Sequence, residues 1–114
     1  MRADTLDILR CPFCGTRLAL VENDALWRVV NRISNLKFLI IETAFSNKER
    51  QLAEVSKHLC PSLLADELAK LDLDPEVWIT HLKPGEIELT MQEIEEGARR
   101  HRPRMLQNGQ VFEF

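Results

Sequence analysis

Two short apolar runs, separated by helical patterns, place the strongest limit on what this chain can fold into. The first run covers residues 38–41 (Phe-Leu-Ile-Ile) and the second covers residues 77–80 (Val-Trp-Ile-Thr). A continuous apolar run is typical of a strand that is covered on both faces, as in parallel sheets. Strands that alternate with helices indicate α/β layering. The sequence therefore predicts an α/β domain with a largely parallel sheet.

Apolar residues at helical spacing predict four helices around these strands. The first follows the cap at Asn23–Asp24 and has on one face Leu26, Val29, Val30 and Ile33. The second begins with a capping box of Ser46 and Glu49, and its apolar face is Leu52, Val55 and Leu59. Pro61 opens the third, whose buried stripe is Leu64, Leu68 and Leu71. The fourth has on one face Ile87, Met91, Ile94 and Ala98.

The C-terminal residues predict a β-hairpin. Met105-Leu106 and Val111-Phe112 flank Asn108-Gly109, and an Asn-Gly pair is a strong signal for a tight turn between two strands.

Composition narrows the class of protein. The formal net charge of −3 does not suggest a nucleic-acid partner, and no apolar stretch reaches the ~18 residues of a membrane span. The first residues lack the apolar core of a secretory signal, so we expect a cytoplasmic protein. Three cysteines form no disulfide framework, which agrees with a reducing compartment.

Three residues after predicted elements are candidates for chemistry. His81 ends the second strand, where active sites of α/β sheets gather. His58 lies where two helices meet, and it is either catalytic or a surface residue that complements a helix C-terminus. Glu42 follows the first strand and is either solvated at the sheet edge or the partner of a histidine, whose tautomer it would fix.

The third histidine, His101, falls in a run of arginines at positions 99, 100, 102 and 104. This run is interpreted as a solvated complement to the end of the fourth helix.

Residues 23–114 resemble the C-terminal part of a metallo-β-lactamase-fold hydrolase of the cyclic-nucleotide phosphodiesterase-like branch. The resemblance rests on five ordered segments, Leu39–Phe45, Ala53–Leu59, Leu63–Leu68, Trp78–Pro84 and Asn108–Phe112. It implies part of an αββα layered fold and the hydrolysis of a phosphodiester substrate by two metal ions, zinc or manganese. It also implies that His81 is a metal ligand, that His58 transfers a proton or stabilises charge, and that Glu42 supports His58.

The sequence departs from this family where the metal cluster should be. The family's His-x-His-x-Asp-His run has no counterpart here, and all three histidines lie after residue 57. Cys60 stands where the family usually has threonine. A stable metal site needs three or four protein ligands, so we expect the chain alone to be inactive. One hypothesis is that a partner chain completes the fold along an open edge of the strand at 38–41.

Residues 1–22 resemble half of a zinc ribbon, as in the ribbons that open some bacterial methyltransferases and small methyltransferase-activating proteins. The resemblance rests on Cys11-Pro12-Phe13-Cys14-Gly15 between two apolar pieces, which would form a short knuckle-like β-hairpin. Four-coordinate zinc needs a second cysteine pair. The alternative function is therefore a zinc-binding module that forms a homodimer by pooling Cys11 and Cys14. The remaining interpretation is two reduced cysteines in a truncated hairpin.

Overall fold

A parallel sheet organises the chain in the structure, a computed structural model that describes residues 5–7 and 24–113. Its strands are β1 (Thr5–Asp7), β2 (Phe38–Glu42), β3 (Glu76–Thr80) and β4 (Arg104–Met105), and they lie side by side in the order of the chain. Leu39 is opposite Val77, and Ile41 is opposite Ile79. The prediction of an α/β domain with a parallel sheet is confirmed.

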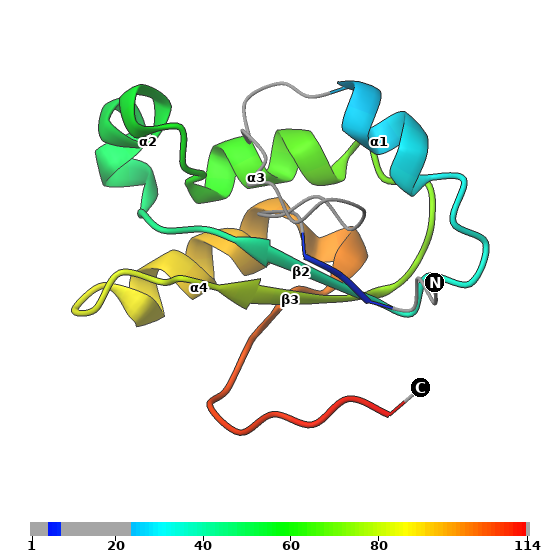
Figure 1. The fold of residues 1–114 in the computed structure, drawn as a ribbon. Helices are drawn as coiled ribbons and strands as arrows, with labels where there is room; N and C mark the ends of the chain where they lie inside the picture. The colour runs from blue at the N-terminus through cyan, green and yellow to red at the C-terminus, as the bar shows by residue number, and fades with distance from the viewer. Residues whose placement is uncertain (1–4, 8–23, 114) are drawn as a thin grey trace.

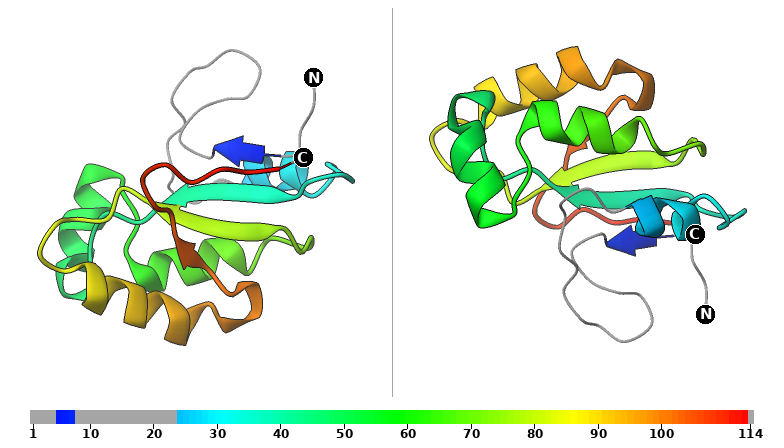
Figure 2. Two further views of the ribbon diagram at one scale, coloured as in Figure 1. Left: turned by 90° about the horizontal axis from the view of Figure 1, so that it is seen from below. Right: turned by 90° about the horizontal axis from the view of Figure 1, so that it is seen from above.

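The helices are α1 (Asp24–Val30), α2 (Arg50–Ser56), α3 (Pro61–Leu68) and α4 (Ile87–Gly97), with short 3-10 turns η1 (Asn47–Glu49) and η2 (Arg99–His101). Crossovers between parallel strands are almost always right-handed. When the strands also follow the order of the chain, this handedness brings successive crossover helices to the same face. Figures 1 and 2 show α1, α3 and α4 on one face of the sheet, with α3 packed against α4.

The hydrophobic core lies between that face and the helices. Alternate residues of the two central strands point into it, and they are Leu39, Ile41, Val77 and Ile79. The predicted burial of Leu64, Leu68 and Leu71 is confirmed, although α3 contains only Leu64 and Leu68 and Leu71 follows its end. Burial of each such side chain stabilises the fold by about 1.5–3 kcal/mol.

The opposite face of the sheet is crossed by the C-terminal segment (residues 106–113), seen in red in Figure 2. Its Phe112 ring lies 4.9 Å from the Phe38 ring and 5.7 Å from the Trp78 ring, centroid to centroid. One aromatic side chain of an irregular segment thus covers the central aromatic residues of this face.

The predicted C-terminal hairpin is wrong. Residues 107–110 do turn, with Gly109 at φ 78° and the Gln110 amide donating to the Gln107 carbonyl over 3.1 Å. The strand before the turn, however, is β4, which pairs in parallel with β3. Residues 110–113 form no strand. The open edge of β3 therefore takes the segment that the turn signal assigns to a local hairpin.

The predicted capping box at Ser46 and Glu49 is also wrong. Ser46 precedes η1, but its hydroxyl donates to Glu86 over 3.0 Å. Glu49 binds the Lys83 ammonium at 2.8 Å. Both side chains join η1 to the loop after β3, because partners from distant segments replace the local ones.

The apolar face predicted for α2 is only partly buried. Leu59 is buried, but it lies beyond the end of the helix, while Leu52 and Val55 are 47% and 83% exposed. Ala53 is the buried residue of α2.

Two further findings concern the edges of the sheet. β2 pairs with both β1 and β3, so the hypothesis of an open edge at residues 38–41 is wrong. β1 falls in the range assigned to the zinc knuckle, and it joins the main sheet.

None of the helices in residues 24–113 combines the length and the apolar character that crossing a bilayer requires.

Candidate functional site

Glu42, His58 and His81 meet at the carboxyl edge of the sheet. Glu42 is the last residue of β2 and His81 directly follows β3, its parallel neighbour. His58 comes from the segment between α2 and α3. Clefts at the carboxyl ends of parallel strands are the usual place for binding sites in α/β folds. The three residues named from the sequence therefore share one location.

The end of α2 places His58 at the carboxyl edge of the sheet. Lys57 adopts a left-handed conformation at φ 60°. The Lys57 amide donates to the Glu54 carbonyl and the His58 amide donates to the Ala53 carbonyl, over 3.4 and 2.9 Å. This bonding pattern is a Schellman motif, which ends the helix and turns the chain sharply. A lysine gives no sequence signal for such a turn, because glycine is the residue usually found there.

Glu42 is fully buried and faces the segment that carries His58. Its Oε1 accepts the Leu59 amide hydrogen at 2.9 Å and lies 3.3 Å from His58 Nδ1. That second contact is electrostatic, since it lacks the alignment of a hydrogen bond, and Oε2 has no hydrogen-bond partner among the described residues. Burial raises the pKa of the Glu42 carboxyl above its usual 4.5, while the Leu59 amide and His58 act in the opposite direction.

The two imidazoles are stacked. The His58 and His81 rings are 6.0 Å apart and 7° from parallel, and the Phe45 ring packs edge-on against His58 at 5.9 Å. His81 holds a left-handed backbone at φ 67°. A non-glycine residue in this conformation costs about 1–3 kcal/mol and is frequent at functional sites.

A pocket of about 390 Å³ opens beside the two rings, and it is lined by Ala44, Phe45, His58, His81, Leu82, Lys83 and Pro84. This volume is in the range of small-molecule sites. Lys83 is the one lysine or arginine of the lining, and Glu49 both binds its ammonium and raises its pKa. The pocket is therefore mostly apolar with two imidazoles at its wall.

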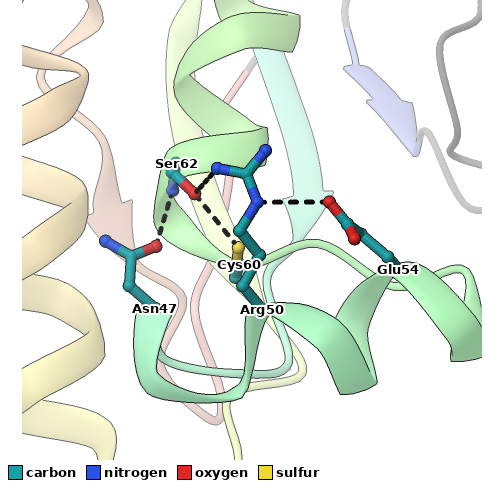
Figure 3. Close-up of polar contacts among 5 residues, drawn as sticks. All are labelled: Asn47, Arg50, Glu54, Cys60 and Ser62. Atoms are coloured by element: carbon teal, nitrogen blue, oxygen red, sulfur yellow. Dashed lines mark hydrogen bonds and ion pairs between the residues drawn. The ribbon is translucent and has the colours of Figure 1, made fainter.

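A polar network joins the start of α3 to η1 and α2 (Figure 3). The Ser62 amide donates to Asn47 Oδ1 at 2.9 Å, and Arg50 bridges Ser62 and Glu54 at 3.2 and 3.1 Å. The buried thiol of Cys60 lies 3.3 Å from the Ser62 hydroxyl. The network joins the elements on both sides of the segment that carries His58. The sequence did not indicate it, because the contacts of Ser62 join α3 to residues of η1 and α2, and local spacing does not predict such contacts.

The other candidates are not part of this location. Cys11 and Cys14 lie outside the described residues, so their role as zinc ligands stays a prediction. In residues 24–113, whose side chains the structure describes, no group of three His, Cys, Asp or Glu side chains is placed to hold a metal ion. His101 is buried, contrary to the interpretation of a solvated run, and its Nε2 bonds to the Leu68 carbonyl at 2.9 Å.

Burial lowers the pKa of His101 below its usual 6.5, so the stability of the protein should fall in mild acid. The unfolded chain binds a proton near pH 6.5 and the folded chain binds one only at lower pH, so the His101 contribution is complete above pH 6.5 and is lost below it. We expect His101→Gln to cost about 1 kcal/mol at pH 7 and to flatten the decline between pH 7 and pH 5. Urea unfolding across this range measures both effects. Equal slopes for the two proteins would contradict the assignment to His101, since all other groups are shared.

Comparison of the chain with protein-family models, with characterised proteins and with solved structures found no match. The class that the structure itself defines is a small α/β domain with a parallel sheet, helices on one face and a histidine-lined pocket at the carboxyl edge.

Proposed function

We propose that residues 23–114 are the C-terminal part of a metallo-β-lactamase-like phosphodiester hydrolase and that the chain is inactive alone. The observation that carries the proposal is the meeting of Glu42, His58 and His81 beside one pocket. The αββα layering of that family needs a second sheet, and the face crossed by residues 106–113 is where it would pack in the complete fold.

The three side chains suit different tasks toward a phosphodiester. Glu42 occupies the Nδ1 side of His58, which leaves Nε2 to face a ligand. A carboxylate in this position orients the imidazole. His58 can then donate a proton to a leaving oxygen or stabilise the charge of the phosphate. His81, stacked beside it, supplies a second imidazole to the same pocket.

A metal ion does not fit the described residues by themselves. His81 is one ligand, and His58 already has Glu42 beside Nδ1. A zinc or manganese site needs about three or four protein ligands, and residues 24–113 offer no group of three. The family's metal chemistry therefore requires ligands from elsewhere, and no reaction step through a metal follows from these residues.

Two measurements test this proposal. We expect no hydrolysis of bis(p-nitrophenyl) phosphate above background with Mn²⁺ or Zn²⁺. We expect dimethyl phosphate at millimolar concentration to shift the imidazole NMR signals of His58 and His81 but not those of buried His101. Glu42→Gln should weaken the His58 response, because the orienting charge is lost.

Two results would count against the proposal. Metal-dependent turnover that disappears in His81→Ala would show that the site is complete, and unshifted signals for both pocket histidines would remove the phosphodiester site. Zinc that stays bound in His81→Ala but is lost in Cys14→Ser would support the alternative module built on Cys11 and Cys14.

A further inference from the structure

A second hollow of about 700 Å³ lies at the other edge of the sheet, where β3 and β4 begin. Its lining comes from residues 74–76, Glu95 and residues 99–104. The histidine pocket follows the carboxyl end of β3, whereas this hollow adjoins Glu76, the first residue of the same strand. The two sites are therefore separated by the length of β3, and the proposed function makes no use of the second one.

Four arginines within six residues line this hollow, which we name the arginine hollow. Arg104 already has partners, because it forms an ion pair with Glu76 and its guanidinium lies 4.4 Å from the centre of the Trp78 ring. Arg99, Arg100 and Arg102 are exposed and form no ion pair with any residue in the described part of the chain. Three positive charges with no ion-pair partner among the described residues thus border one concave surface of an otherwise acidic protein.

The backbone holds these arginines in place. Arg99 and Arg100 belong to η2, and Arg102 follows it in a left-handed conformation at φ 46°. His101, between them, is anchored to the Leu68 carbonyl on the buried side. This hydrogen bond lies between Arg100 and Arg102 in the chain. Their side chains therefore project from a fixed turn rather than from a mobile tail.

We propose that the arginine hollow binds a polyphosphate group, such as pyrophosphate or the phosphates of a nucleoside triphosphate. Guanidinium groups donate paired hydrogen bonds whose geometry matches phosphate oxygens. Asp74 and Glu95 also line the hollow and repel anions, so a ligand with a single negative charge gains little there. Adjacent phosphates carry enough charge to bridge several guanidinium groups at once.

Isothermal titration calorimetry of the full chain with pyrophosphate at low ionic strength tests this proposal. We expect the double variant Arg99→Gln/Arg102→Gln to weaken binding about tenfold or more, since each guanidinium contributes charge-assisted hydrogen bonds. Glu95→Gln removes a repelling carboxylate and should tighten binding by about two- to fivefold. Added salt should weaken binding throughout.

A matched control separates this site from general electrostatic attraction. Arg32→Gln removes an exposed arginine from the segment after α1 and should leave the affinity for pyrophosphate unchanged. Equal affinities for pyrophosphate and ATP would assign recognition to the phosphates alone, and tighter binding of ATP would add a contact to the nucleoside. Absence of pyrophosphate binding, or equal losses in the double variant and Arg32→Gln, would overturn the proposal.

Discussion

Glu42→Ala should destabilise the protein by about 2 kcal/mol, whereas Glu42→Gln should make it more stable at pH 7. Alanine leaves the buried Leu59 amide without an acceptor and opens a cavity, and each loss costs about 1–3 kcal/mol. Removal of a buried charge offsets part of this cost. Glutamine retains an acceptor for the amide and fills the same volume without carrying a charge.

The pH dependence separates these effects. The pKa of Glu42 is raised by burial, so the folded chain takes up its proton at a higher pH than the unfolded chain, whose value is near 4.5. The wild-type protein should therefore gain stability from Glu42 as the pH falls from neutral toward 4.5. The advantage of Glu42→Gln should shrink over the same range. Urea unfolding at several pH values measures this difference in stability between the two proteins. A wild-type protein more stable than Glu42→Gln at pH 7 would show that the charge of Glu42 is fully compensated.

Removal of residues 107–114 should cost about 2 kcal/mol and make the protein self-associate. Phe112 packs against Phe38 and Trp78, and Figure 2 shows the C-terminal segment crossing that face of the sheet. Without it, an aromatic patch on the sheet is exposed to water, and such patches drive association. The truncation leaves the bond from the Leu106 amide to the Ile79 carbonyl, so β4 stays paired.

Light scattering coupled to size exclusion, together with urea unfolding, measures both effects. Phe112→Ala should reproduce most of the change, whereas Val111→Ala is the matched control because Val111 is 79% exposed. A truncated chain with the same oligomeric state and the same stability as the full chain would show that the C-terminal segment does not protect this face.

The elements that the sequence predicted are those whose signal lies within one segment. The apolar runs of β2 and β3 and the stripe of Leu64 and Leu68 each repeat with the period of the structure they form. The position of His81 could be predicted as well, because this residue directly follows a strand that the sequence indicates. The predicted roles of His58, His81 and Glu42 remain proposals, although the structure brings the three residues together.

The elements that the sequence did not predict depend on contacts between distant segments. The Ser46 hydroxyl donates a hydrogen bond to Glu86 and does not cap the helical turn that follows it. The Ser62 amide donates to Asn47 of η1. At the C-terminus, the Asn-Gly signal correctly indicates a turn, but the vacant edge of β3 determines which residues become a strand. Local propensity is a weak guide wherever a tertiary partner offers a better hydrogen bond.

The strand order has a consequence for how the sheet assembles. Each strand lies beside the strand that precedes it in the chain, so no strand has to be inserted between two that are already paired. During synthesis from the N-terminus, every new strand meets an edge that is already present. β4 is the last strand in this order, and the C-terminal segment that follows it reaches back across Trp78 and covers the aromatic face.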